Sequence, residues 1–259
     1  MKCVGGAVFA APPFEFEMKK KIYAKIADIP FQIELQNECL EQYYKDYLCE
    51  PTEDAAKISV SESELQQVRQ MYITETSEYL VELNEHILRV GDRLLDYDKC
   101  VFHGSAFLWH DKAWIFTAPS GTGKTSQYVL WKMLFDDEIC ILNGDKPVLE
   151  FLENQILVHP SPWRGKENMG IKHSAPIGGI IYLRQGRENH METLCVKQAV
   201  QPIFGQFLFS ASNATRIKQV AALEERLLRL VRTWQFTNCG DKASARFSHN
   251  WLCKEMEGE

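Results

Sequence analysis

The octapeptide Ala-Pro-Ser-Gly-Thr-Gly-Lys-Thr at residues 118–125 constrains this chain more than any other segment. Gly121 and Gly123 allow the backbone to bend tightly and to approach phosphate oxygens. Lys124 is long enough to reach the β and γ phosphates of a nucleotide, and the Thr125 hydroxyl suits magnesium. The pattern therefore predicts a phosphate-binding P-loop.

The residues on either side of this loop supply the context that the motif requires. The apolar run at 113–118 predicts a strand that enters the loop, and residues 125–135 carry helix formers with an apolar stripe. A helix that starts here adds its partial positive charge to the backbone N–H groups. This context favours a P-loop over a glycine-rich turn with an incidental lysine, although Ala118 stands where the general pattern has glycine. We expect ATP and Mg²⁺ to bind here, with contacts from Ser120, Gly121, Thr122, Gly123, Lys124, Thr125 and Ser126.

Composition and charge exclude several other classes of function. The 259 residues are enough for one large domain, and no window approaches the roughly 18 apolar residues of a membrane span. We therefore expect a cytoplasmic protein without a membrane partner. The formal net charge of -6 argues against a broad nucleic-acid-binding surface. Because the 8 cysteines include no Cys-x-x-Cys pair, we expect reduced, mostly buried thiols and no zinc site.

The spacing of the apolar runs predicts an α/β fold with a mixed, twisted sheet. The runs at 100–109 and 113–118 flank a short polar turn, so an antiparallel hairpin delivers the P-loop. A second hairpin is predicted from 148–152 and 156–159. Connections this short cannot carry a crossover helix, which excludes an all-parallel sheet. Further core strands are expected at 139–142, 179–183 and 234–237.

Helices are predicted from apolar residues spaced by three and four positions and from capping residues. Residues 61–96 predict two helices, of which the second is longer. Further helices are predicted at 194–209 and 214–231, and Asp241 is expected to cap a C-terminal helix.

The N-terminal part alternates in short apolar and polar pieces, such as Phe-Glu-Phe-Glu at 14–17 and Phe-Gln-Ile-Glu-Leu at 31–35. This alternation is typical of strands and predicts a small β-rich layer over residues 1–51, with an N-terminal strand and no leader peptide. We assign residues 1–96 to an N-terminal segment packed on the core, with no requirement that it be a separate domain. Residues 97–259 are assigned to the nucleotide-binding domain.

Phosphoryl transfer needs a carboxylate for the metal and a group that orients or deprotonates the acceptor. Asp145 is the candidate carboxylate because it follows the predicted buried strand at 139–142. Ligands of α/β sheets bind at this carboxyl edge. The alternative interpretation is a turn aspartate, since the preceding Asn143-Gly144 pair itself favours turns.

Three features occur in order along the chain: His103-Gly104, the Ser-Gly-x-Gly-Lys-Thr loop, and an aspartate at the end of the next strand. Together they resemble the nucleotide-binding core of the HPr kinase/phosphorylase family, which shares a fold with phosphoenolpyruvate carboxykinases. The Pro-Trp-Arg-Gly-Lys segment at 162–166 is similar to one in small kinases of this kind, and Gly-Asp-Lys-Ala-Ser-Ala at 240–245 resembles their closing helix start. The resemblance covers about residues 97–183 and implies an ATP- and Mg²⁺-dependent kinase.

The resemblance implies roles only for the residues that match. His103 would lie near the γ-phosphate and position or deprotonate the acceptor, as an imidazole can; the alternative is a hydrogen-bonded core histidine. Asp145 would bind Mg²⁺ together with Thr125. It matches the second of two adjacent aspartates, and Gly144 occupies the place of the first. The chain therefore either relies on His103 or Asp145 alone as the base, or has weakened chemistry.

Arg164 and Lys166 lie in a loop that also contains two prolines and a tryptophan. A guanidinium there can bind phosphate oxygens through two hydrogen bonds and stabilise the transferring charge, which makes Arg164 a candidate catalytic residue. Lys166 is a candidate nucleotide contact. The alternative is that both are solvated loop cations.

These residues predict a kinase that transfers the γ-phosphoryl group of ATP to a hydroxyl. The acceptor is unidentified, and a serine of a protein or peptide and a small molecule are both open. The alternative is a catalytically weak ATP-binding regulatory or assembly protein, which Gly144 favours, and a simple nucleotide hydrolase is a third interpretation. A homo-oligomer is compatible with the sequence.

Overall fold

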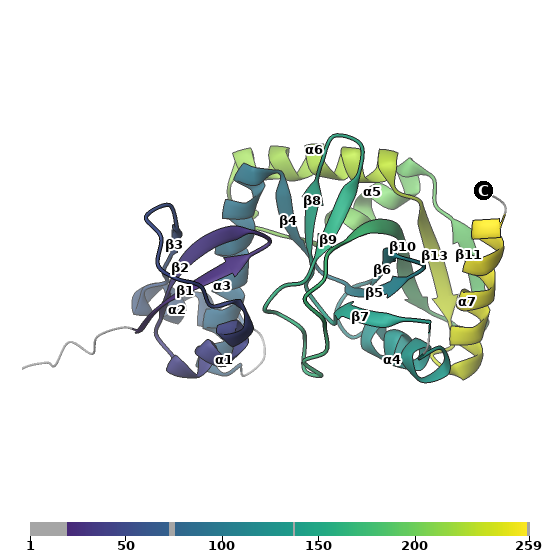
Figure 1. Ribbon diagram of the computed structural model, residues 1–259, viewed down its shortest axis with the longest axis horizontal. Helices are drawn as coiled ribbons and strands as arrows, with labels where there is room; N and C mark the ends of the chain where they lie inside the picture. The colour runs from purple at the N-terminus through teal and green to yellow at the C-terminus, as the bar shows by residue number, and fades with distance from the viewer. Residues whose placement is uncertain (1–19, 73–75, 137, 258–259) are drawn as a thin grey trace, which may run out of the picture.

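The computed structural model describes residues 20–72, 76–136 and 138–257, which form a mixed α/β structure with a small sheet and a large one (Figure 1). The strand expected at 14–17 lies outside the described residues. The small sheet and its helices sit at one end of the molecule, and the large sheet with its helices forms the rest. The predicted α/β class with mixed sheets is confirmed.

The small sheet consists of β1 (Lys20–Ile26), β2 (Ile29–Leu35) and β3 (Ala56–Ile58). Ala27 and Asp28 join β1 to β2 with φ of 46° and 67°, as a two-residue hairpin turn requires. The stretch after β2 is helical, although it falls within residues 1–51, for which the sequence predicts a β-rich layer. It forms η1 (Glu38–Leu40), α1 (Glu41–Tyr44) and η2 (Lys45–Tyr47), because Leu40, Tyr44 and Tyr47 bury one side of a helical turn.

Two helices follow the small sheet, as predicted: α2 (Glu62–Arg69) and α3 (Glu78–Leu94). Ser61 and Glu64 form a capping box, with Ser61 N–H donating to the Glu64 carboxylate at 2.7 Å. The apolar face of α3 packs against the small sheet and also against the large one, in a cluster that contains Val90 and Val101. The domain boundary at residue 97 stays a prediction.

The large sheet has ten strands, in the order β12-β4-β8-β9-β10-β6-β5-β7, with β13 beside β10 and β11 beside β13. The strand β10 joins two parts of this sheet, since its first residues pair antiparallel with β9 and the remainder runs parallel to β6 and β13. The bounds are β4 (Lys99–Phe102), β5 (Ser105–Trp109), β6 (Lys112–Thr117), β7 (Cys140–Asn143), β8 (Val148–Phe151), β9 (Ile156–His159), β10 (Ala175–Gln185), β11 (His190–Thr193), β12 (Phe207–Leu208) and β13 (Thr233–Asn238).

Both predicted hairpins are present, because β5 pairs antiparallel with β6 and β8 with β9. The run at 100–109, however, is two strands and not one. The chain breaks at His103-Gly104, so that β4 pairs with β8 while β5 pairs with β6. At this break the chain passes close to β6: a Cβ on Gly104 would lie 2.6 Å from Ile115 Cγ2 and 3.1 Å from the Phe116 oxygen.

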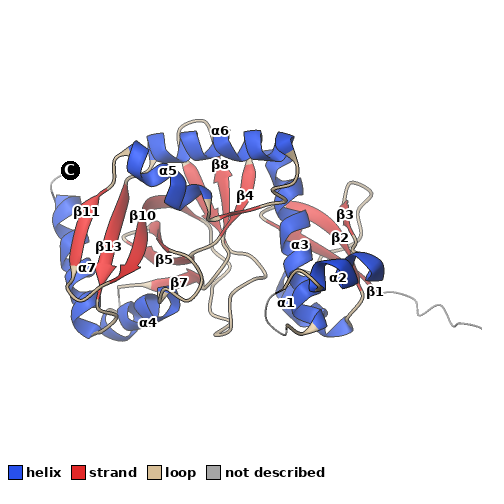
Figure 2. Cartoon of the chain, turned by 180° about the vertical axis from the view of Figure 1, so that it is seen from behind, coloured by secondary structure: helices blue, strands red, loops and turns tan. Residues whose placement is uncertain are grey.

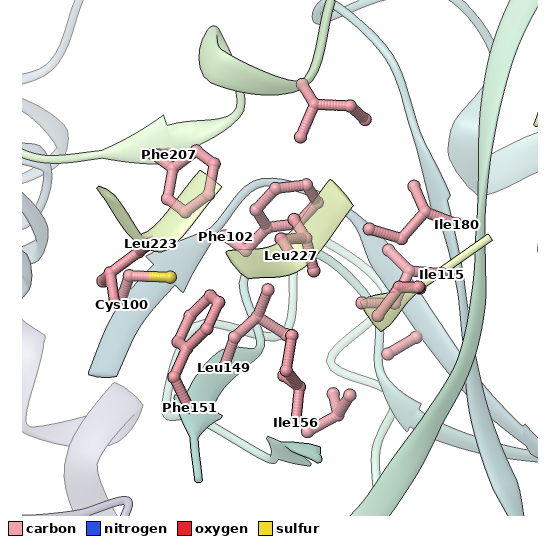
Figure 3. Packing of buried hydrophobic residues seen from close by; sticks show 14 of the residues in the cluster. Cys100, Phe102, Ile115, Leu149, Phe151, Ile156, Ile180, Phe207, Leu223 and Leu227 are labelled. Carbon is pink, nitrogen blue, oxygen red and sulfur yellow. The ribbon is translucent and has the colours of Figure 1, made fainter. Parts of the chain in front are cut away.

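Helices cover both faces of the large sheet (Figure 2). On one face, Phe116 and Ile181 are packed against α4 (Lys124–Leu134) and α7 (Lys242–Glu257). On the other face, Ile115 and Ile180 are packed against α5 (Val196–Phe204) and α6 (Ala214–Leu230) (Figure 3). Successive strand residues point to opposite faces, so one strand serves both cores.

The predicted cap is confirmed, since Asp241 Oδ1 accepts the Ser244 N–H at 2.8 Å. The helix expected over 194–209 ends at Phe204, and Phe207–Leu208 form β12 on the edge of β4.

A chain of polar groups, which we call the Lys99 relay, connects the small sheet to the large one. Lys99 Nζ donates to the Ala27 carbonyl at 2.9 Å and pairs with Glu150 Oε1 at 2.8 Å. Glu150 Oε2 lies 2.8 Å from His159 Nε2, and His159 Nδ1 lies 2.8 Å from Ser174 Oγ. Burial raises the pKa of Glu150, but the hydrogen bonds from Lys99 and His159 outweigh it and leave that pKa below its ordinary value.

The described cysteines are all free thiols. The expectation that they are mostly buried is wrong, because among them only Cys100 is buried. Cys39 in η1, Cys195 before the first residue of a later helix and Cys239 after β13 are exposed. None of the helices in the described ranges is long and apolar enough to cross a membrane.

Candidate functional site

The glycine-rich loop at residues 118–125 joins the end of β6 to the start of α4. Its two glycines lie in the left-handed region, with φ of 81° at Gly121 and 102° at Gly123, which other residues rarely adopt. A Cβ on either glycine would meet no described atom within 4 Å. The loop thus leaves room beside its backbone at the α4 N-terminus, where the first N–H groups of a helix lack intrahelical partners. The predicted strand, loop and helix are present in this order.

Lys124 folds back over the loop that precedes it. Its Nζ donates to the carbonyls of Ala118 at 2.8 Å and Pro119 at 3.3 Å, and the residue is only 7% exposed. Burial is the main cause that lowers the pKa of Lys124; Asp145 opposes the shift and Lys146 adds to it. The ammonium therefore lies inside the loop, within the electrostatic field of Asp145.

The direction of the strands explains why His103 and Asp145 meet beside this loop. The strands β6 and β7 both run antiparallel to β5. The carboxyl ends of β6 and β7 therefore lie beside the amino end of β5, along the sheet edge that these strand ends form. His103 precedes β5 and Asp145 follows β7, and the Gly104 N–H donates to the Asp145 carbonyl at 2.9 Å. The structure therefore brings the loop, His103 and Asp145 to the same edge.

Asp145 projects from a tight turn that Asn143 organises. The Asn143 side-chain oxygen accepts the N–H of Asp145 at 3.0 Å and the N–H of Lys146 at 2.8 Å. Asn143 is itself buried and donates to the Ser161 carbonyl at 3.2 Å. The turn interpretation of the Asn-Gly pair and the site interpretation of Asp145 are thus compatible, because the turn fixes the carboxylate.

His103 faces Asp145 with its Nε2 3.6 Å from Asp145 Oδ1. Burial is the largest cause that lowers the pKa of His103, to about 4; Lys124 and Lys146 lower it further, and Asp145 opposes them. The imidazole is therefore neutral at physiological pH. The Thr117 hydroxyl, at the end of β6, donates to the His103 carbonyl at 2.7 Å and ties the histidine to the start of the loop.

Lys146 is a member of this site that no sequence pattern singles out. Its Nζ forms an ion pair with Asp145 Oδ2, on the opposite oxygen from His103. The Lys146 N–H donates to the Trp163 carbonyl at 3.1 Å, so the main chain beneath the side chain is held in place. A lysine next to an aspartate in a turn looks like a solvated charge in sequence, and only the strand directions reveal that it shares an edge with Lys124.

The loop at residues 161–170 packs on the turn at Gly144. The Gly144 N–H donates to the Met169 carbonyl at 3.2 Å, and a Cβ on Gly144 would lie 2.5 Å from the Arg164 carbonyl oxygen. Real Cβ atoms do not approach a backbone oxygen so closely. The glycine in place of a second carboxylate is therefore coupled to the position of this loop, since an aspartate at 144 would displace it.

The structure does not bring the Arg164 guanidinium to the glycine-rich loop. Arg164 Nη1 pairs with Asp46 Oδ2 at 3.1 Å, and its guanidinium lies 5.6 Å from the Tyr47 ring centre. Lys166 is exposed at the tip of the same loop. The segment instead places its main chain beside Asp145, since a Cβ on Gly165 would lie 3.2 Å from the Asp145 Cβ. The phosphate roles of Arg164 and Lys166 stay predictions.

Two further side chains border the site and have no sequence signal that would select them. Tyr128, on α4, is buried, and burial with the nearby carboxylates of Glu167 and Asp145 raises its pKa to about 12. Gln206 contacts His103: its backbone carbonyl accepts the backbone N–H of His103 at 2.8 Å, and the interaction of its side chain with the histidine acts to raise the His103 pKa. A tyrosine in a helical stripe and a glutamine before a short edge strand are ordinary structural residues in sequence.

Thr125 and Asp145 supply the hydroxyl and the carboxylate that suit a magnesium ion bound to phosphates. Within the described ranges, no group of three or more His, Cys, Asp or Glu side chains could hold a metal by protein ligands alone. Magnesium in nucleotide sites is usually bound by one or two protein oxygens together with phosphates and water. The residues present therefore fit a nucleotide-borne Mg²⁺.

Comparisons with known proteins add little to this description. No family model matches the chain, and no curated protein matches it. Among solved structures, the Hpr(Ser) kinase/phosphatase from Coxiella burnetii aligns with 59% of this chain and 97% of its own, with a TM-score of 0.35 and 9% sequence identity. A likeness of this degree carries no weight for fold or function, and the site must be judged on its own geometry.

Proposed function

We propose that this protein is an ATP-dependent phosphotransferase that moves the γ-phosphoryl group to a hydroxyl of a protein, a peptide or a small molecule. The observation that carries the proposal is the meeting of the glycine-rich loop, His103 and Asp145 at one sheet edge. We further propose that residues 118–125 act as a P-loop. In this proposal residues 97–259 form a kinase-like unit of the HPr kinase and phosphoenolpyruvate carboxykinase type, with residues 1–96 packed on it.

Each residue has a distinct part in the proposed reaction. The N–H groups at the α4 N-terminus and Lys124 bind the β and γ phosphates, which requires Lys124 to leave the Ala118 and Pro119 carbonyls. Thr125 and Asp145 would hold Mg²⁺, and the ion would supply positive charge to the phosphate oxygens. The phosphates beside Lys124 raise the low pKa of His103 and make it a better base.

In the transfer itself, the acceptor oxygen forms a bond to the γ-phosphorus while the bond to the bridging oxygen of ADP breaks. The hydroxyl proton passes to His103 Nε2 or to Asp145. These two groups face each other at 3.6 Å, so a hydroxyl between the histidine and the γ-phosphate is within reach of both. The loop at 161–170, which contacts the Asp145 turn, would shield the reacting atoms from water.

The test is ATP consumption with Mg²⁺ across a panel of hydroxyl acceptors, for wild type and for Lys124→Ala and Asp145→Asn. Lys132→Ala is the matched control, since Lys132 is a half-exposed lysine on the same helix, paired with Asp136. Acceptor-dependent turnover that both site variants lose and the control keeps is the expected result. Turnover without any acceptor would favour a hydrolase.

One observation favours a second candidate, a regulatory or assembly protein that binds ATP with little turnover. The space that a second carboxylate at position 144 would need is filled by the Arg164 carbonyl, so the turn itself supplies one carboxylate, Asp145. Tight MgATP binding with no turnover toward any acceptor would support this candidate over the kinase.

A further inference from the structure

The site contains two lysine side chains and two carboxylates. Lys124 and Lys146 each carry an ammonium, Asp145 pairs with Lys146 Nζ, and Glu167 lies nearby on the loop at 161–170. The second acidic position is filled by backbone at Gly144. A turn with one carboxylate in place of two, beside two ammonium groups, suits one divalent cation and an anion of high charge, and it is poorly suited to two metal ions.

Both ammonium groups have internal partners that an incoming ligand can replace. Lys124 Nζ donates to two loop carbonyls, and Lys146 Nζ pairs with Asp145 Oδ2. Asp145 is also the candidate magnesium ligand. If Asp145 turns to a cation, Lys146 loses its partner at the sheet edge where the loop ends, and its charge is then available to a phosphate.

The main chain at Lys146 is fixed, whereas its side chain is held by the ion pair with Asp145. Its N–H is held by the Asn143 side chain at 2.8 Å and by the Trp163 carbonyl at 3.1 Å. Its carbonyl accepts a hydrogen bond from the Ser161 hydroxyl. The side chain has a relative accessibility of 20%. Such a residue can move its ammonium by rotamer changes alone, without rearranging the turn.

We propose that Lys146 is a second phosphate-binding lysine, which exchanges its ion pair with Asp145 for the γ-phosphate when a nucleoside triphosphate enters with a single Mg²⁺. This inference rests on the proposed function and names the ligand class of the site, a triphosphate in preference to a diphosphate. Lys146 supplies positive charge that a second metal ion would otherwise bring to the γ-phosphate.

The first test measures MgATP and MgADP binding by calorimetry for wild type, Lys146→Gln and Lys146→Arg, with Lys132→Gln as the paired-lysine control. Lys146→Gln should weaken ATP binding by at least about tenfold and ADP binding by less than about threefold, because a charge-assisted hydrogen bond to the third phosphate is lost. Lys146→Arg should keep most of the preference for ATP. Circular dichroism and thermal unfolding establish that each variant is folded.

A double-mutant cycle separates Lys146 from a general effect of charge. In buffer without Mg²⁺, Asp145→Asn frees Lys146 and should tighten ATP binding several-fold, and the added Lys146→Gln should abolish that gain. Equal losses for ATP and ADP in Lys146→Gln, or a gain that survives in the double variant, would overturn the role of Lys146 and leave the proposed function standing. Wild-type protein that binds no MgATP would overturn both.

Discussion

Two regions of this molecule contain the same three kinds of side chain, a lysine, a carboxylate and a histidine, in different states. In the Lys99 relay each side chain is within hydrogen-bond distance of the next. The distances from Lys99 to Glu150 and from Glu150 to His159 are both 2.8 Å, and the Ser174 hydroxyl is hydrogen-bonded to the other histidine nitrogen. At the sheet edge His103 stays 3.6 Å from Asp145. The relay is hydrogen-bonded at every step, whereas at the sheet edge Asp145 pairs with Lys146 and leaves His103 at a longer distance.

The difference lies in what surrounds each array. The relay lies between the small sheet and the large one, where Lys99 is nearly buried and also bonded to the Ala27 carbonyl. Charges in such a place are stabilising only while every partner is present. The array at the sheet edge is about one-fifth to one-quarter exposed and adjoins a loop that bends around open space. Similar residues therefore serve packing in one place and, in our proposal, binding in the other.

Removal of a carboxylate should have opposite consequences in the two arrays. Glu150→Ala leaves the Lys99 ammonium buried beside a carbonyl, and we expect the free energy of unfolding to fall by about 3 kcal/mol. Urea unfolding followed by circular dichroism measures this loss. A drop of well under about 1 kcal/mol would mean that the relay does not stabilise the fold.

The matching change at the sheet edge is Asp145→Asn. Because this pair is partly exposed, the free energy of unfolding should change by less than about 1 kcal/mol. Acceptor-dependent ATP turnover should fall by about 100-fold, since the carboxylate that faces His103 is removed. A variant that turns over ATP at the wild-type rate would contradict the role assigned to Asp145.

The packing at Gly144 offers a sharper comparison between two glycines. Gly144→Ala brings a Cβ to 2.5 Å from the Arg164 oxygen, and we expect the unfolding free energy to fall by about 1–3 kcal/mol. Gly205→Ala is the control, because its Cβ would meet its first neighbours at 3.8 Å with φ of -64°. Equal melting temperatures for the two variants would show that the loop at 161–170 can move away from a Cβ at 144 without loss of stability.

The smallest expected effect is on the pH dependence of ATP binding. The folded pKa of His103 is about 4, below its ordinary 6.5, and bound phosphates should raise it. The complex then holds more protons than the free protein, so ATP affinity rises as the pH falls from above the raised pKa toward 4. If the bound phosphates raise this pKa from about 4 to about 5, the affinity should rise about fivefold by pH 4 and approach a tenfold rise only at lower pH. ATP titrations of wild type and His103→Gln at several pH values isolate the contribution of His103 to the pH dependence of binding. Identical pH profiles for the two proteins would exclude that contribution.

Much of this site follows from local sequence. The glycines of the loop, the hairpin that enters it and the cap at Asp241 are short-range signals, and each was confirmed. The break at His103-Gly104 was missed because both flanking runs are apolar, and only pairing with β8 or β6 separates them. The pairing of Arg164 with Asp46 joins residues 118 positions apart, which no local pattern reports.

Lys146 shows the same limit at the site itself. Its neighbours in sequence make it look like a turn residue, and its importance arises from the antiparallel placement of β5 between β6 and β7. Side chains that share a sheet edge can be expected from sequence only when the strand order is known. The order here, with β10 joining two parts of the sheet, does not follow from the spacing of apolar runs.

The contact between Gly144 and the Arg164 carbonyl also bears on how this site can change over generations. An acidic residue at 144 is incompatible with the loop at 161–170 in its present place, because its Cβ would lie 2.5 Å from the Arg164 oxygen. Gaining a second carboxylate is therefore a path with a required order of steps, in which the loop moves first. A chain that takes the steps in reverse must pass through a less stable intermediate.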